Sequence, residues 1–215
     1  EGALYKFDQR SNLNPIFSDS TDGVQKRTRR HEDNSDLQAF VNGLNLADQN
    51  ARIAHFFDHA NVPNLINYVA VRAINMDSDD VRKNMYMYRD TRGTGEWFIL
   101  PWDKDWTYGI EGDGGSFLRH PFFGDQFHAK QNANQYSVLW TVIFNDPPLR
   151  EMYLRRLRTL MDQYLQPPGT PAAAGWFEQR VDQWYRSVSN AIPGIAANVT
   201  TLKKYFTTRR KALFV

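Results

Sequence analysis

Two runs of β-forming residues, separated by a short glycine-bearing connection, constrain the fold of this chain most strongly. Residues 84–90 and 96–100 are rich in Met, Tyr, Trp, Phe and Ile, and the connection between them carries Gly93 and Gly95. Such runs on either side of a turn of about five residues are typical of a β-hairpin. The sequence therefore predicts a hairpin over about residues 84–100, in a chain whose other patterns are mostly helical.

Apolar residues at helical spacing predict helices through most of the remaining chain. One helix is expected to begin at Pro63, with Leu65, Ile66, Val69, Ala70, Ala73 and Ile74 on one face. We expect that face to be buried, so that the helix supports the acidic loop that follows it. Further helices are predicted from Ser35, as the N-cap, through Leu44, and over residues 47–58, 148–165, 176–190 and 196–213. The helix over 148–165 is expected to bury Leu149, Met152, Tyr153, Leu157, Leu160, Met161 and Leu165.

These patterns favour a mainly α chain with a small β-hairpin. Its 215 residues are long enough to bury a core. Residues 1–7 are strand-like, but residues 8–35 are polar and include the basic run 26–30, which is typical of a solvated loop; an anionic-ligand site is the alternative. We expect residues 1–35 to form an irregular N-terminal segment and residues 36–215 a helical lobe that contains the hairpin.

Composition excludes several function classes. The 26 basic and 24 acidic residues give a net charge of +2, which offers no charge-based support for nucleic-acid binding. No apolar run approaches the roughly 18 residues of a membrane span. Cysteine is absent, which excludes disulfides and thiolate chemistry. The aromatic share of 14% indicates rigid packing or a stacking surface, and we expect Tyr86, Tyr88, Trp102 and Trp106 to pack in the core and hairpin.

Acidic residues gather at both ends of the predicted hairpin. They are Asp77, Asp79 and Asp80 before it and Asp103 and Asp105 after it. Because a hairpin brings its two ends together, Asn84 and Asp103 should be neighbours, and Asp103 should lie within metal-bridging reach of Asp77 or Asp79. Crowded carboxylates are unfavourable unless a cation compensates them. Oxygen ligands without His or Cys indicate Mg²⁺, Mn²⁺ or Ca²⁺.

The spacing of Asp79 and Asn84 is that of a protein-kinase catalytic loop. In kinases this Asp accepts the proton of the substrate hydroxyl, the Asn holds a metal ion, and a later Asp holds metal on the phosphates. The spacing alone leaves three interpretations open, which are solvated helix and turn caps, a structural Ca²⁺ site, and phosphoryl transfer.

Several segments resemble the spore coat protein H (CotH) kinase-like family. Its hallmark is an Asn-aromatic-x-x-Tyr-Arg-Asp strand followed by Pro-Trp-Asp-x-Asp-x-Thr-aromatic-Gly. Residues 84–90 read Asn-Met-Tyr-Met-Tyr-Arg-Asp, and residues 101–109 read Pro-Trp-Asp-Lys-Asp-Trp-Thr-Tyr-Gly. Residues 155–162 and 202–210 look like the helical end of the same family, so the resemblance covers nearly the whole chain.

The resemblance implies an atypical protein-kinase-like fold, of which this chain would be the C-terminal, α+β lobe. It also implies transfer of phosphate from ATP, with Mg²⁺ or Mn²⁺, to Ser or Thr of a Ser-rich protein at the cell surface, in the envelope or outside the cell. By position, Asp79 would be the catalytic base, with Asp77 and Asp80 as competitors. Asn84 and Asp103 would be metal ligands, and Asp105 the second choice.

The sequence departs from the kinase pattern in two respects. No His-Arg pair precedes the acidic loop, and we expect the given sequence to begin after the family's N-terminal lobe. Among the lysines near the start, Lys6 is the candidate for ATP binding and Lys26 a further possibility. The alternative function is a non-catalytic, pseudokinase-like surface protein whose carboxylates hold a structural cation. A third hypothesis is a carbohydrate- or matrix-binding module that uses exposed aromatic side chains.

Overall fold

The computed structural model describes the chain except for residues 9–12, 14–22, 78–83, 110–137 and 215. Its described residues are 56% helical and include a small antiparallel sheet, which agrees with the expected mainly α, α+β class. The elements in chain order are β1 (Ala3–Phe7), β2 (Val24–Lys26), α1 (Ser35–Leu44), α2 (Gln49–His59), α3 (Val62–Asn75), β3 (Met85–Arg89), β4 (Trp97–Pro101), α5 (Val138–Asn145), α6 (Pro147–Leu160), the π-helical turn η2 (Met161–Leu165), α7 (Trp176–Val188) and α8 (Ile195–Leu213).

The predicted hairpin is confirmed as β3 and β4, but it forms only half of a sheet. The strand order is β2-β1-β3-β4, and every neighbouring pair is antiparallel. Strand β1 aligns with β3 from Ala3 opposite Arg89 to Phe7 opposite Met85. Residues 1–35 are therefore not wholly irregular, because they supply β1 and β2. The pairing of β1 with β3 joins segments far apart in the chain, and local patterns do not encode it.

The two faces of the sheet differ in burial because side chains alternate along a strand. Tyr5, Met87 and Ile99 are almost fully buried on the face that carries the core. On the opposite face Lys6 and Tyr86 are half-buried, and Trp102, just past β4, is 44% exposed.

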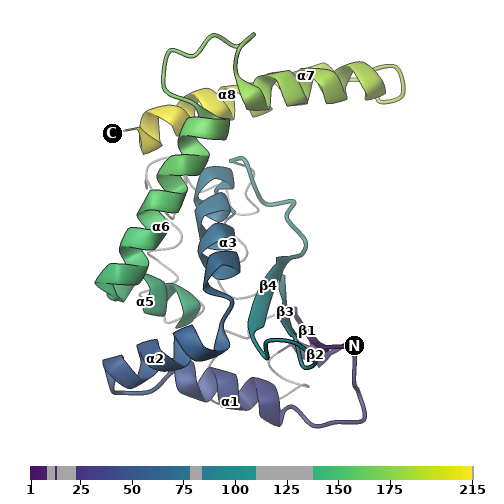
Figure 1. Cartoon of the computed structure of the whole chain (residues 1–215). Coiled ribbons are helices and arrows are strands. Elements are labelled where there is room, and N and C mark those ends of the chain that lie inside the picture. Colours follow the sequence, from purple (N-terminus) through teal and green to yellow (C-terminus); the bar gives the residue numbers. More distant parts are fainter. Residues whose placement is uncertain (9–12, 14–22, 78–83, 110–137, 215) are drawn as a thin grey trace.

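Helix α3 is the buried helix that the sequence predicts. All six residues expected on its apolar face are at most 5% exposed. The Asn61 side chain caps its first turn by accepting a hydrogen bond from the Asn64 amide at 3.0 Å, and Pro63 lies in that turn. It packs against α6 and β4 (Figure 1). Its rigid end leads directly into the acidic segment.

The other predicted helices form with small differences. The N-cap of α1 is Asn34, with Ser35 as the first helical residue. The predicted helix over 148–165 is α6 continued by η2, and Met152 is 46% exposed rather than buried. Leu149, Tyr153 and Leu157 recur every fourth residue, so Met152 lies on the flank of the buried stripe.

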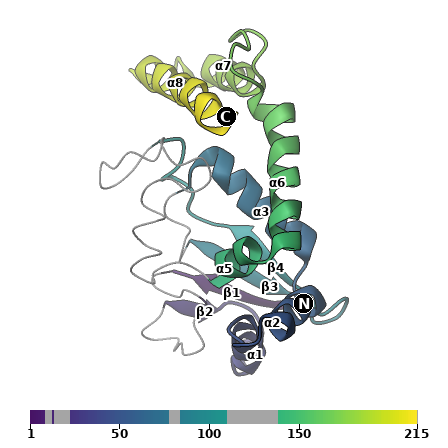
Figure 2. The same cartoon turned by 90° about the vertical axis from the view of Figure 1, so that its left-hand side faces the viewer.

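Helices α7 and α8 follow the two remaining predictions and pack on one another at one end of the molecule (Figure 2). Among the described helices, none has the length and apolar character needed to cross a membrane.

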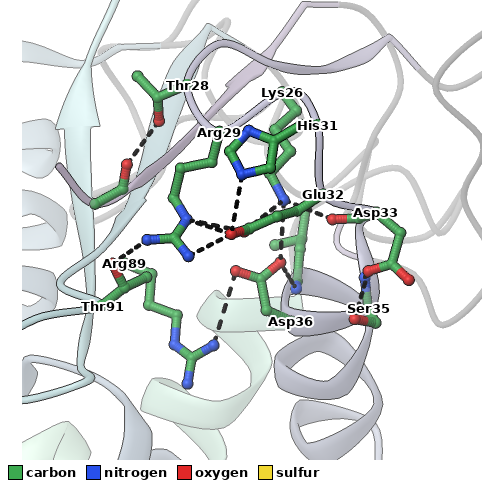
Figure 3. A network of polar contacts seen from close by, with 12 residues as sticks. Lys26, Thr28, Arg29, His31, Glu32, Asp33, Ser35, Asp36, Arg89 and Thr91 are labelled. Carbon is green, nitrogen blue, oxygen red and sulfur yellow. Dashed lines mark hydrogen bonds and ion pairs between the residues drawn. The ribbon is translucent and has the colours of Figure 1, made fainter.

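Two residues of the basic run at 26–30, Lys26 and Arg29, belong to a network of ion pairs (Figure 3). The Arg29 guanidinium donates to the Glu32 carboxylate at 2.8 and 2.9 Å, and this bond lowers the pKa of Glu32. The Lys26 ammonium lies 4.0 Å from Asp36, which also accepts a 2.5 Å hydrogen bond from the Tyr5 hydroxyl. Lys26 and Arg29 are thus compensated by local carboxylates, which does not favour an anionic-ligand site here.

Candidate functional site

Helix α3 ends in a left-handed turn at Met76, and the acidic segment follows this turn. Met76 has φ 51° and ψ 51°, and its amide donates to the Arg72 carbonyl. Asp77 follows and is only 5% exposed. Asp79 and Asp80, the other candidates for the catalytic base, lie outside the described residues, so the assignment of Asp79 stays a prediction.

Asn84 joins the two ends of the hairpin. Its backbone amide donates to the Phe7 carbonyl at 2.9 Å, and its backbone carbonyl accepts from the Trp102 backbone amide at 3.3 Å. Its side-chain Nδ2 donates a long hydrogen bond of 3.5 Å to the Asp103 carbonyl. The residue is 2% exposed and has φ 59°, a left-handed conformation that Asn tolerates better than most residues. The expected proximity of Asn84 and Asp103 is confirmed.

Lys104 is a feature of the site that the sequence analysis missed. Its ammonium forms an ion pair with the Asp77 carboxylate at 2.8 Å and donates to the Asn84 carbonyl at 2.8 Å. A lysine therefore compensates the buried Asp77, where we had expected a cation to relieve crowded carboxylates. The sequence signal for this role of Lys104 was its position between Asp103 and Asp105, just after β4.

Asp103 and Asp105 present exposed side chains beyond the end of β4. Asp103 also has a left-handed backbone, with φ 53°, so two of the three candidate metal ligands have this conformation. Within the described ranges, no group of three or more His, Asp or Glu side chains is placed to hold a metal ion. The assignment of Asn84, Asp103 and Asp105 as metal ligands stays a prediction.

Lys6 lies on the partly exposed face of the sheet, next to the end of β4. Its ammonium is 3.0 Å from the Asp8 carboxylate and 5.2 Å from the centre of the Trp102 ring. The Tyr86 ring packs edge-to-face on Trp102 at 5.4 Å. Trp102 thus packs on the hairpin, as expected, but at 44% exposed it is not part of the core, and neither is Trp106 at 36% exposed. A cation and an exposed aromatic side chain therefore lie together at Trp102, the residue before Asp103.

A pocket of about 410 Å³ lies between α3 and the end of β4. Its lining includes Tyr68 and Asn75 from α3, Leu100 from β4, and the Asp77–Lys104 ion pair at one end. The Lys104 ammonium also lies 5.7 Å from the centre of the Tyr68 ring. The pocket therefore combines apolar surface with amide and charged groups, directly beside the hairpin ends.

Comparison with known proteins identifies the family. A search of the curated proteins found no match. The family model described as CotH kinase protein matches residues 1–213, essentially the whole chain. Its match agrees with the resemblance carried by residues 84–90 and 101–109. The chain belongs to the CotH kinase family.

Proposed function

We propose that this chain is a kinase domain that transfers the γ-phosphate of ATP to Ser or Thr of a secreted or envelope protein. Family membership supports a kinase-like function. The observation that carries the proposal is the junction of the hairpin ends, where the buried Asn84 amide bonds the backbone of Asp103. This bond places the Asn84 side chain beside the backbone of Asp103, which supports our assignment of both residues as ligands of the metal that a kinase binds on the phosphates.

The residues at this junction fit a hard divalent cation. Mg²⁺ and Mn²⁺ prefer oxygen ligands, and Asn84, Asp103 and Asp105 offer amide and carboxylate oxygens. In the described part of the chain, neither Asp103 nor Asp105 forms an ion pair, so no lysine or arginine there neutralises the two carboxylates. A bound Mg²⁺ would supply positive charge to the phosphates of ATP.

The remaining roles fall to residues of this chain. Asp79 accepts the proton of the substrate hydroxyl while the hydroxyl oxygen forms a bond to the γ-phosphorus of ATP. The bond between the γ-phosphorus and the β,γ-bridging oxygen breaks, and ADP leaves. Lys6 binds phosphate oxygens in exchange for its ion pair with Asp8. Lys104 is held by Asp77 and Asn84, so we assign it to the support of the site rather than to the phosphates.

The test is incorporation of labelled phosphate from ATP and Mg²⁺ into the protein itself and into a synthetic Ser-rich polypeptide. Asp103→Ala should lower the rate by about 10²-fold or more, because one group that stabilises charge in the transition state is lost. Asp103→Asn, whose side chain suits the left-handed backbone at this position, should lower the rate as well and should leave thermal unfolding nearly unchanged, since the side chain is exposed. Asp58→Asn, which alters an exposed carboxylate on α2, is the control and should keep the full rate. A wild-type protein without transfer, or an unimpaired Asp103→Ala variant, would refute the proposal.

The second candidate is a non-catalytic protein with the same fold. The Asp77–Lys104 ion pair favours it, because one carboxylate of the predicted cluster is already compensated. This candidate predicts that Ca²⁺ or Mg²⁺ raises the unfolding temperature without nucleotide, and that no labelled phosphate is transferred.

A further inference from the structure

Two side chains of α8 bond the last turn of α3. The Arg209 Nε donates to the Ala73 carbonyl at 3.0 Å, and its Nη2 donates to the same oxygen. The Tyr205 hydroxyl donates to the Ile74 carbonyl. The last four carbonyls of a helix have no partner within the helix, so side chains that bind them fix how the helix ends. The end that they fix is the one from which the acidic segment leaves.

The same part of α8 also holds the segment after Asp103. The Tyr108 amide donates to the Asn75 carbonyl at 2.7 Å, which joins this segment to α3. The Tyr108 ring packs edge-to-face on Tyr205 at 5.6 Å and on Phe206 at 5.7 Å. Gly109 has φ 81°, and a Cβ there would lie 3.3 Å from the Tyr205 ring. Tyr205 therefore contacts both chain segments that form the candidate site.

The burial of Tyr205 and Arg209 indicates that their hydrogen bonds, and not only their packing, hold the end of α3. Arg209 is 0% and Tyr205 4% exposed. Burial raises the pKa of Tyr205, so that its hydroxyl stays a donor, and lowers the pKa of Arg209. Burying a guanidinium costs more than burying an apolar side chain of similar volume, unless its hydrogen bonds are made. Simple packing at this position would be served equally well by a side chain such as Met.

We infer that Tyr205 and Arg209 are positioning residues for phosphoryl transfer. By bonding the Ala73 and Ile74 carbonyls and packing on residues 108–109, they set the end of α3, which Asp77 follows, relative to the segment that follows Asp103. The catalytic consequence rests on the proposed function. Transfer depends on placing the base and the metal ligands to within fractions of an ångström, and a displacement of about 1 Å can cost 10²-fold in rate.

The test compares variants of α8 in the folded protein. Tyr205→Phe removes one hydroxyl and keeps the ring, Arg209→Met removes the guanidinium donors, and Arg209→Lys keeps a charged donor group. The matched control is Arg210→Met. Arg210 is also buried on α8, but it pairs with Glu178 and donates to the Leu165 carbonyl, away from α3.

We expect Tyr205→Phe and Arg209→Met to lower kcat about ten- to a hundredfold, with KM for ATP changed less than twofold. Lys6, which we assign to ATP, is on β1 of the sheet and not on α8. Arg209→Lys should recover part of the loss. Arg210→Met should lower the unfolding temperature but keep the wild-type kcat at an assay temperature below its unfolding transition. Unchanged kcat in Tyr205→Phe and Arg209→Met, or an equal loss in Arg210→Met, would overturn the inference.

Amide hydrogen exchange separates this inference from the proposed function. The Asp77 amide donates to the Arg72 carbonyl, and the Tyr108 amide to the Asn75 carbonyl. Both should exchange about tenfold faster in Tyr205→Phe, and at the wild-type rate in Arg210→Met. If the wild-type protein transfers no phosphate, the proposed function fails but this measurement still decides the inference. Unchanged exchange in Tyr205→Phe would show that α8 does not position the two segments.

Discussion

Lys104 sets the electrostatics at the ends of the hairpin. Its ammonium forms an ion pair with the Asp77 carboxylate and also donates to the Asn84 carbonyl. Lys104 therefore joins the end of α3 to the start of β3. Asp77 is 5% exposed and the Lys104 side chain 25% exposed, so the pair is largely removed from water. Removing the cationic partner of a buried carboxylate strongly destabilises a fold, whereas exposed ion pairs contribute little to stability.

Lys104→Met should therefore destabilise the protein by about 2 kcal/mol, below the range for a fully buried pair because Lys104 remains partly exposed. Urea unfolding gives the change in free energy. Asp105→Asn, at the exposed neighbouring position, is the control and should lie within about 0.5 kcal/mol of wild type. Equal stability of Lys104→Met and wild type would show that the ion pair does not support the site.

Helices α1 and α2 are joined through His55. Its Nε2 lies 3.1 Å from the Phe40 carbonyl, and its ring stacks on His59 at 4.2 Å. A Cβ at Gly43 would lie 2.1 Å from that ring, so only glycine allows this packing. Desolvation lowers the pKa of His55 and the His59 charge lowers it further, against the Phe40 hydrogen bond and the Asp58 charge.

A lowered pKa makes the packing of α1 on α2 sensitive to acid. The folded protein binds fewer protons at His55 than the unfolded chain, so this contribution is complete above the unfolded value of about 6.5 and is lost as pH falls below it. We expect a lower unfolding temperature at pH 5.5 than at pH 7.5. His55→Gln, whose amide can still donate to Phe40, should reduce that difference. His31→Gln, at an exposed histidine, should keep it, and an unaltered difference in His55→Gln would contradict this account.

At the scale of the whole molecule, local patterns predicted most of the elements, but not β2 or α5, and missed their long-range connections. The hairpin and α3 follow from alternation and helical spacing, and the proximity of Asn84 and Asp103 follows from hairpin geometry. The pairing of β1 with β3 and the bond from Arg209 to Ala73, 136 residues apart, join segments that no local pattern relates. The partner of Asp77 was missed for a different reason. We expected a bound cation where Lys104, close in sequence, supplies the charge.

In the function that we propose, nucleotide and a divalent metal bind together at the hairpin ends. The most direct test is calorimetric titration of the wild-type protein with ATP, in the presence and absence of Mn²⁺, repeated with Asp103→Asn and with Asn84→Gly, which keeps the left-handed backbone at residue 84. Because coupling between two ligands is reciprocal, a shared site requires Mn²⁺ to strengthen ATP binding. We predict that it does so at least about tenfold in wild type, and that both variants lose most of this effect while remaining folded. ATP affinity that is independent of Mn²⁺, or coupling that persists in both variants, would contradict the account.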